Sequence, residues 1–429
     1  MQKIQFSDME LSNEMQRAVE EMGFEEPTSI QAASIPMILS GRDVIGHSQT
    51  GTGKTAAFSI PAIEKINPAG GRKTQVLILC PTRELAVQAC DEIRKFAKYK
   101  PFLKVVPIYG GQPIERQFTA LRGGAQIVVG TPGRVMDHMR RGTLKLDTLH
   151  MIILDEADEM LSMGFREDIE TILKDVPQER QTILFSATMS PEIMRITKQY
   201  QTDPELIRIT REQLTVPNIE QTYYEVPVGK KTEVLSRLLD VYNPSRSIVF
   251  CNTKKQVDEL VEELHARGYQ ARGLHGDMKQ GERTQIMNGF RRGSIDILVA
   301  TDVAARGIDV EDIAAVFNYD IPQDVEYYVH RIGRTGRIGK EGRAFTFVTG
   351  RRQIYELRDI ERFTKSKITL KAVPSSSEVN ETNERKFLDR VRVVLEEGGL
   401  EEYTPYTDAL LEDYASLDIS AALIKMLLK

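Results

Sequence analysis

Short, uninterrupted apolar segments alternate with longer amphipathic segments along most of this chain. In the first half, buried strands are predicted at five such segments: 44–46, 75–80, 126–129, 151–154 and 182–185. They are rich in Val, Ile and Leu, and they lack the alternation of apolar and polar residues that marks a strand with one face in water. Strands buried on both faces predict a parallel sheet with helices packed on each side.

The second half repeats this arrangement, with strands expected at 247–250, 296–300, 314–317 and 344–348. The sequence therefore predicts an α/β fold, with two tandem parallel-sheet domains and a small all-helical C-terminal segment. We expect the first domain at 1–207, a linker at 208–217 that ends in Pro217, the second domain at 218–371 and the helical segment at 376–429. The break Pro374-Ser-Ser-Ser377 separates the last two.

Composition excludes several classes of protein. The 429 residues suit two or three domains, and no stretch approaches the roughly 20 apolar residues that span a bilayer. The first residues lack the apolar core of a signal peptide. Cys80, Cys90 and Cys251 are too few and too scattered for a disulfide framework, so we expect them in the core. These features favour a cytoplasmic protein with no membrane partner.

Net charge is unevenly distributed. The chain as a whole carries −5, but residues 372–429 hold 12 acidic and 6 basic residues. The other 371 residues hold 50 acidic and 51 basic residues. Because the acidity belongs to the C-terminal segment, the main body can still present a basic groove to a polyanion.

A glycine-rich motif follows the first predicted strand and opens a helix, which is the setting of a phosphate-binding loop. Its glycines let backbone N–H groups turn toward phosphates, Lys54 supplies charge, and Thr55 can reach Mg²⁺. Ser48 replaces the usual Gly or Ala, and a flexible Gly/Thr turn is the alternative interpretation. The predicted nucleotide-binding residues of this motif are Ser48, Gln49, Thr50, Gly51, Thr52, Gly53, Lys54 and Thr55.

Adjacent carboxylates end the predicted strand 151–154, about a hundred residues downstream. Asp155 is suited to hold Mg²⁺, and Glu156 to orient and deprotonate an attacking water. An acidic turn that merely caps a strand is the alternative, and the phosphate-binding motif upstream makes it the weaker one. Lys54, Asp155 and Glu156 are thus candidate catalytic residues, with Thr55 and Asp155 as metal ligands.

With Asp155-Glu-Ala-Asp158 in this setting, the chain resembles the DEAD-box RNA helicases of superfamily 2, from about residue 6 to residue 350. Further motifs of that family occur in order, and these are 23–31, 81–86, 110–111, 131–134, 186–188, 249–252, 280–283, 300–309 and 330–337. The resemblance implies two RecA-like domains that use ATP and Mg²⁺. It also implies ATP-dependent unwinding of short RNA duplexes by domain closure.

The resemblance implies further residues around ATP. Phe24 would stack on adenine, and Gln31 would bond it bidentately, because an amide matches the N6 donor and N7 acceptor. An exposed helix position is the alternative for Gln31. Asp309 would lie near the ribose or phosphates, and Arg334 and Arg337 would act as arginine fingers. For Arg331 we expect, at least in part, a solvated basic face.

A polar chain would couple hydrolysis to closure. The resemblance implies that Ser186 and Thr188 hydrogen-bond to Asp158, with His330 nearby, although a core histidine is the alternative for His330. RNA would be gripped through phosphates and sugars, largely without regard to sequence and through the 2′-OH. The residues implied in RNA binding are Pro81, Thr82, Arg83, Gly110, Gly111, Thr131, Pro132, Gly133, Arg134, Asn252, Arg283 and Thr301.

Three rival functions remain open. An ATP-gated RNA clamp would carry identical motifs. A double-stranded DNA translocase is disfavoured by the complete Asp-Glu-Ala-Asp motif together with Gln31, and a metabolic P-loop kinase is disfavoured by the arginines of the second domain.

The C-terminal segment resembles the dimerisation segment of bacterial cold-shock DEAD-box helicases. Phe387, Val391, Val394 and Leu395 form one apolar stripe, Leu410 begins another, and Asp418 is expected to cap a last helix. We expect a homodimer through 376–429, with docking onto the second domain as the alternative. The resemblance also implies a stress-response role and RNA-decay or ribosome-assembly partners. Relatives often continue into a basic extension, whereas this sequence stops at Lys429 inside an apolar helical pattern.

Overall fold

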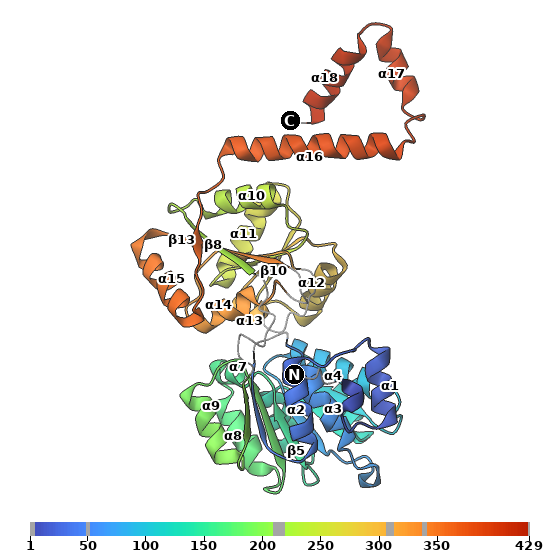
Figure 1. Ribbon diagram of the computed structural model, residues 1–429, viewed down its shortest axis with the longest axis vertical. Helices are drawn as coiled ribbons and strands as arrows, with labels where there is room; N and C mark the ends of the chain where they lie inside the picture. The colour runs from blue at the N-terminus through green and yellow to red at the C-terminus, as the bar shows by residue number, and fades with distance from the viewer. Residues whose placement is uncertain (1–4, 49–51, 209–218, 306–312, 337–340, 428–429) are drawn as a thin grey trace.

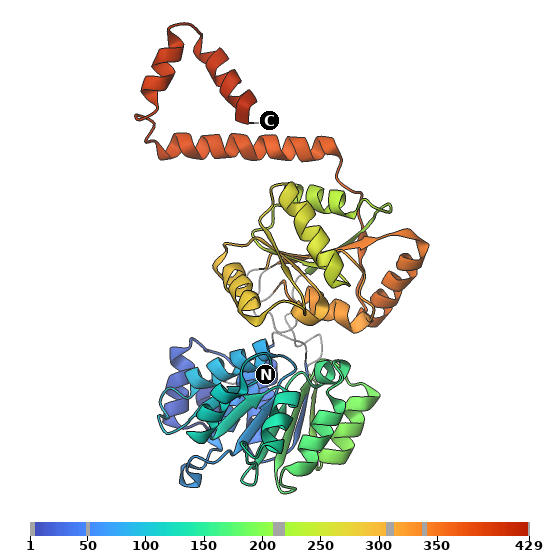
Figure 2. The same ribbon diagram turned by 180° about the vertical axis from the view of Figure 1, so that it is seen from behind.

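Two α/β domains and a helical C-terminal segment follow one another along the chain (Figures 1 and 2). The structure is a computed structural model that describes residues 5–48, 52–208, 219–305, 313–336 and 341–427. The predicted linker 208–217 lies, apart from Arg208, outside the described residues. Within the described ranges, no helix is long and apolar enough to cross a membrane.

The first domain is built on a seven-stranded parallel sheet in the order β3-β4-β2-β5-β6-β1-β7. Its strands are β1 (Val44–His47), β2 (Val76–Leu79), β3 (Val105–Ile108), β4 (Ile127–Gly130), β5 (Met151–Leu154), β6 (Gln181–Ser186) and β7 (Glu205–Arg208). Around it lie α1 (Asn13–Glu21), α2 (Ser29–Leu39), α3 (Lys54–Glu64), α4 (Arg83–Phe96), α5 (Ile114–Arg122), α6 (Pro132–Arg140), α7 (Ala157–Ser162), α8 (Arg166–Asp175) and α9 (Pro191–Tyr200). Short 3-10 helices occupy η1 (Phe6–Asp8) and η2 (Pro68–Gly70).

The second domain contains another seven-stranded parallel sheet, in the order β10-β11-β9-β12-β13-β8-β14. Its strands are β8 (Ile219–Glu225), β9 (Ser247–Phe250), β10 (Ala271–Leu274), β11 (Ile297–Ala300), β12 (Ala315–Asn318), β13 (Gly342–Val348) and β14 (Thr369–Leu370). The helices are α10 (Lys231–Tyr242), α11 (Lys254–Ala266), α12 (Gln280–Arg292), α13 (Asp302–Ala305), α14 (Val325–Ile332) and α15 (Gly350–Thr364).

The two sheets have the same topology. When the strands of the second sheet are renumbered from one, their spatial order is identical to that of the first sheet. Strand β8 therefore corresponds to β1, β9 to β2, and β12 to β5. This correspondence makes it possible to compare the nucleotide-binding loop of the first domain with the same position in the second.

All nine predicted strands are present in the structure. Their apolar side chains are buried between the helical layers, as expected. The pattern missed β3, β7, β8, β10 and β14, which lie at or next to the sheet edges. Edge strands need fewer apolar residues, and β3 even contains Pro107, which has no N–H for a strand partner. The cysteine prediction is also confirmed, since Cys80, Cys90 and Cys251 are buried and unpaired.

The C-terminal segment forms α16 (Ser376–Glu397), α17 (Thr404–Leu411) and α18 (Ser416–Leu427). The first half of α16 packs on α10, where Phe387 is buried and the Lys386 ammonium donates to the Asp240 carbonyl. Beyond it the helices project away from the second domain (Figure 1). Of the described residues in these three helices, only Val379, Phe387 and Ile419 are buried.

Two local predictions for this segment were wrong. Helix α18 begins at Ser416, so Asp418 lies inside its first turn and does not cap it. Leu410 and Leu411 end α17 and do not open a further stripe. The expected stripe of α16 is also divided, because Phe387 faces α10 whereas Val391, Val394 and Leu395 are exposed.

Candidate nucleotide and RNA site

The parallel sheets place the predicted motifs along their carboxyl ends, where open α/β sheets bind ligands. In the first domain, the nucleotide motifs follow β1, β5 and β6, which lie side by side. The predicted RNA motifs follow β2, β3 and β4, which form the other part of the sheet. The candidate nucleotide site and the candidate RNA site therefore lie next to each other on one edge of the sheet, because the strand order groups the motifs in this way.

The phosphate-binding loop leads directly into α3. Gly53 has a φ of 87°, a conformation that strongly favours glycine, and α3 begins at Lys54. The Lys54 side chain is buried, and its ammonium donates to the Ser48 carbonyl at 3.4 Å. Thr52 and Ser48 also join their hydroxyls at 3.2 Å. Gln49, Thr50 and Gly51 lie outside the described residues.

Gln31 is fully buried against this loop, which excludes the exposed helix position. Its amide nitrogen donates to the Gly53 carbonyl at 3.1 Å, and its oxygen accepts from the Thr28 N–H at 2.9 Å. The Thr28 hydroxyl donates to the Thr52 carbonyl at 2.8 Å. Gln31 therefore holds the loop in this structure, and adenine reading by Gln31 stays a prediction. Phe24 is half-buried beside the rings of Phe6 and Phe96.

The Asp155 carboxylate is buried at the end of β5. Burial raises its pKa to about 7, although the nearby Lys54 ammonium opposes this shift. One of its oxygens, Oδ1, is buried without a hydrogen-bond partner in the protein. A cation would satisfy this oxygen and favour the ionised form.

Glu156 is buried and has a φ of 49°, in the left-handed region that non-glycine residues rarely adopt. Such backbone strain is concentrated at functional sites, where the surrounding fold holds a residue in place. The strained turn follows the strand directly and precedes α7. It is therefore consistent with the role expected of Glu156.

The link between α7 and β6 runs through backbone groups. Asp158 Oδ2 accepts from the N–H groups of Ala187 and Thr188, at 3.1 and 2.8 Å. The Ser186 hydroxyl donates to the Thr188 carbonyl at 2.6 Å, and the Thr188 hydroxyl is buried without a protein partner. Thr188 therefore bonds Asp158 as expected, through its backbone N–H, whereas the Ser186 hydroxyl bonds the Thr188 carbonyl instead of Asp158.

A side-chain pair connects the two domains beside the nucleotide motifs. His330 Nε2 lies 3.3 Å from Glu159 Oε1, and the side chains of both residues are largely buried. Burial lowers the pKa of His330, although the nearby carboxylates of Glu156 and Asp158 oppose this. The histidine therefore lies beside α7, near Asp158 as expected, and contacts Glu159. Arg334 is buried, and its Nε donates to the His330 carbonyl at 3.2 Å.

Arg331 does not lie on a solvated face, contrary to the prediction. Its side chain is 1% exposed and forms a bidentate pair with Asp302, at 2.5 and 2.7 Å. It also donates to the Asp320 carbonyl at 2.6 Å and to Asn252 Oδ1 at 3.0 Å. Helical spacing could not reveal this, because these partners lie in segments that follow β9, β11 and β12, far from Arg331 in the sequence.

The predicted RNA residues of the first domain lie in loops and helix starts. Thr82 caps α4, Thr131 precedes α6, and Gly111 has a φ of 78°. Arg83 stacks on the Tyr109 ring at 4.5 Å. Of the others, Pro81 and Pro132 are buried, Gly110 and Gly133 are exposed, and Arg134 donates to the Gln112 carbonyl at 3.3 Å.

In the second domain, the corresponding residues follow β9, β10 and β11, in the same part of the sheet as in the first domain. The Asn252 amide is engaged internally, donating to the Ile321 carbonyl at 2.9 Å. Arg283 forms an ion pair with Glu84 of the first domain at 3.2 Å. Thr301 ends β11 and bonds Leu274 through its backbone. Asp309 and Arg337 lie outside the described residues.

The position equivalent to the phosphate-binding loop in the second domain is closed by an ion pair. Gly229 precedes α10, which begins at Lys231 just as α3 begins at Lys54. Lys231 bonds Asp320 Oδ1 and the Tyr319 carbonyl, both at 2.7 Å. Asp320 follows β12, the counterpart of β5 and Asp155. Because Lys231 and Asp320 bond each other, this position has a structural role in the second domain.

The residues present fit Mg²⁺ as a companion of bound nucleotide. Mg²⁺ is usually held by one or two protein oxygens, with phosphates and water completing its shell. The unpartnered Asp155 Oδ1 and the partly exposed Thr55 at the start of α3 meet this requirement. Within the described residues, no group of three or more His, Cys, Asp or Glu side chains could hold a metal by itself.

Three family models match this chain. Residues 28–196 match the DEAD/DEAH box helicase family, and residues 230–339 match the helicase conserved C-terminal domain. Residues 374–429 match the RNA helicase DeaD dimerization domain. These matches cover the first domain, the second domain and the three C-terminal helices in turn.

Several known proteins are similar over nearly the full length. The DEAD-box ATP-dependent RNA helicase CshA of Geobacillus kaustophilus is 51% identical, with 98% of this chain and 90% of that protein covered. CshA of Bacillus subtilis is 49% identical over 99% of this chain and 86% of that protein.

The structure of S. cerevisiae Dbp5 bound to RNA and ADP BeF3 is 31% identical, with a TM-score of 0.79 over 89% of this chain and 99% of that chain. A DEAD box protein from Methanococcus jannaschii is 44% identical, with a TM-score of 0.51 over 86% of this chain and 99% of that chain. The motifs, the paired sheets and these similarities agree, and the chain belongs to the DEAD-box ATP-dependent RNA helicases.

Proposed function

We propose that this enzyme locally unwinds short RNA duplexes when ATP closes its two domains. One observation carries the proposal: the nucleotide motifs and the predicted RNA residues share the carboxyl edge of both sheets, and the pairs His330–Glu159 and Glu84–Arg283 join these edges. Closure would then assemble the nucleotide site and the RNA grip in one movement. A duplex that cannot follow the geometry of the grip would lose one strand.

ATP would be bound by the loop from Ser48 to Thr55, with Lys54 at its outer phosphates. Mg²⁺, held by Asp155 and Thr55, would neutralise charge on the phosphates. Glu156 would orient the attacking water and take its proton, and Arg334 would stabilise charge on the transferring phosphoryl group. Gln31 would report the bound nucleotide by exchanging its loop contacts for contacts with adenine.

RNA would be held mainly by backbone amides, hydroxyls and single arginines. The complex of S. cerevisiae Dbp5 with RNA and ADP BeF3 supports RNA as the ligand. Arg283 pairs with Glu84 beside the Thr82–Arg83 loop, so the two domains would grip RNA together only when closed. Asn252 would act through Arg331, because its amide is engaged within the domain.

A homodimer would form through α16–α18. The match to a dimerisation domain supports it, as does the exposure of Leu417, Leu423, Met426 and Leu427 on a segment with few buried residues. Two tethered cores would gain avidity on long RNA without any new RNA contact.

A strand-displacement assay tests the proposed unwinding. A short duplex beside a single-stranded RNA should separate with ATP, and Glu156→Gln should bind the RNA with ATP but not turn over. An RNA clamp would retain single-stranded RNA with ATP yet leave the duplex intact. Stimulation of the ATPase by DNA as strong as that by RNA would contradict the proposal.

A further inference from the structure

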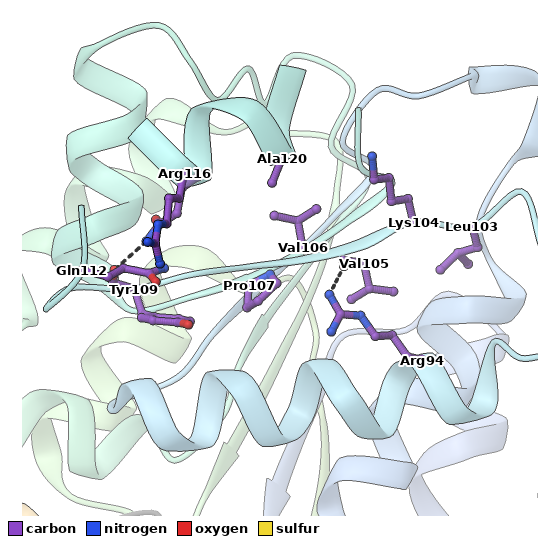
Figure 3. A pocket seen from close by; sticks show the side chains of 11 residues that line it. Arg94, Leu103, Lys104, Val105, Val106, Pro107, Tyr109, Gln112, Arg116 and Ala120 are labelled. Carbon is purple, nitrogen blue, oxygen red and sulfur yellow. Dashed lines mark hydrogen bonds between the residues drawn. The ribbon is translucent and has the colours of Figure 1, made fainter. Parts of the chain in front are cut away.

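A groove lies along β3, the edge strand of the first sheet, between α4 and α5 (Figure 3). Its volume is about 390 Å³, and we call it the β3 groove. Arg94 of α4 borders it on one side, and Arg116 of α5 on the other, with Lys104 near the start of the strand. None of the residues assigned to the nucleotide or RNA motifs lines it.

The charged side chains that line the β3 groove are all positive. Arg94, Lys104 and Arg116 line it, and no Asp or Glu does. Arg94 is partly used, because it donates to the Val105 carbonyl at 2.9 Å and pairs with Asp91. Lys104 and Arg116 are exposed to solvent. A groove lined by positive charges attracts a polyanion. Lys and Arg side chains bind the successive phosphates of a nucleic-acid backbone.

The groove opens at the predicted RNA grip. Strand β3 leads into Tyr109 and then Gly110-Gly111, and both Tyr109 and Gln112 line the groove. The Gln112 carbonyl accepts from Arg134, and the Tyr109 ring carries Arg83 at 4.5 Å, so two predicted RNA residues contact groove residues directly. An RNA strand lying on the Gly110-Gly111 loop would therefore be next to the groove.

The edge of β3 is poorly suited to an added peptide strand. Pro107 has no N–H, and the Val105 carbonyl is occupied by Arg94. Backbone pairing along this edge is thus interrupted at two of its four residues. A ligand that uses phosphates and a stacking surface fits better than one that needs strand hydrogen bonds.

We propose that the β3 groove binds the sugar-phosphate backbone of the RNA arm that continues past the Gly110-Gly111 loop. This inference rests on the proposed function, because it extends the RNA track of the closed enzyme. Lys104 and Arg116 would each contact one phosphate, and Tyr109 would lie at the junction. The groove would add affinity for long RNA without any preference for sequence.

The test compares the full chain with a Lys104→Gln/Arg116→Gln variant. Binding is measured with a non-hydrolysable ATP analogue, on a single-stranded RNA of about six nucleotides and on versions extended by about ten nucleotides at the 5′ or 3′ end. The variant should bind the short RNA like the parent. On one of the extended RNAs it should lose affinity, and the slope of log affinity against log salt should fall by about 1.4, or about 0.7 per phosphate contact.

The matched control is Lys174→Gln/Lys198→Gln, which removes the same charge from exposed positions of α8 and α9. It should leave both affinity and slope near those of the parent. Equal slopes for the groove variant and the parent on both extended RNAs would overturn the inference, and so would an equal loss on the short RNA. A parent that fails to bind the short RNA with nucleotide would instead overturn the proposed function. Unchanged thermal unfolding of the variant shows that it is folded.

Discussion

Among single residues, Lys54 and Glu156 should separate nucleotide binding from hydrolysis. Lys54 is buried at the start of α3, and Glu156 is held in a strained turn beside Asp155. Replacing Glu156 with Gln keeps its shape and removes its ability to accept a proton. Replacing Lys54 with Ala removes a charge from the phosphates.

We therefore expect Glu156→Gln to retain ATP and RNA in a long-lived complex while hydrolysis falls by at least about 10²-fold. Lys54→Ala should weaken ATP binding itself. Equilibrium binding of a labelled nucleotide and single-turnover hydrolysis, measured on the same samples, distinguish the two effects. Hydrolysis by Glu156→Gln at the parental rate would show that this carboxylate is not the base.

Arg331 should be essential for the stability of the second domain. Arg331→Met would leave Asp302 largely buried and without its charge partner, a change that typically costs about 3–5 kcal/mol. Calorimetry of the full chain should show one unfolding transition moved to lower temperature. Arg352→Met is the control, because its ion pair with Glu356 is exposed and should be worth less than about 1 kcal/mol. Equal shifts in the two variants would refute the buried network.

At the scale of elements, α4 and α12 are joined across the domains by Glu84 and Arg283, whose side chains are 20% and 14% exposed. Glu84→Arg or Arg283→Glu should each raise the RNA concentration needed to stimulate hydrolysis by about tenfold, which corresponds to ~1.4 kcal/mol of coupling. The double reversal should recover part of the loss. The same exchange of Lys230 and Glu233, an exposed pair within the second domain, should change little. No recovery in the double variant would mean that the two residues act separately.

Helix α16 has two parts with different surroundings. Its first half docks on α10 through Phe387, and its second half presents Val391, Val394 and Leu395 to solvent. Docking onto the second domain is therefore seen for the first half of α16, and a dimer contact stays a proposal for the second half. The division follows from geometry, because α10 is too short to cover all of α16.

For the whole molecule, we expect a chain that ends at Pro374 to be monomeric while the full chain is a dimer. Leu417→Asp/Met426→Asp should weaken the dimer, because both side chains are more than two-thirds exposed and would enter the interface. Glu401→Gln serves as the control on the same segment. Light scattering at micromolar concentration measures each mass. A full chain that remains monomeric would contradict the proposed dimer.

The central strands and the nucleotide motifs could be predicted from the amino-acid sequence. Apolar segments predicted the central strands, since burial on both faces leaves a strong local pattern. Compact motifs such as 48–55 and 155–158 predicted the nucleotide chemistry, because a phosphate loop needs adjacent residues of particular types. The four edge strands and β8, which lies next to an edge, left weaker patterns and were missed.

The contacts between side chains that are distant in the sequence could not be predicted and were seen only in the folded chain. Arg331 looked solvated by helical spacing, yet it is buried against Asp302 and Asn252. Gln31 holds the phosphate-binding loop, and His330 contacts Glu159. In the second domain, Lys231 pairs with Asp320 at the position that corresponds to this loop. Spacing in the sequence records which residues share an element. The partners of a buried polar group come from other strands and helices, and packing alone brings them within hydrogen-bond distance.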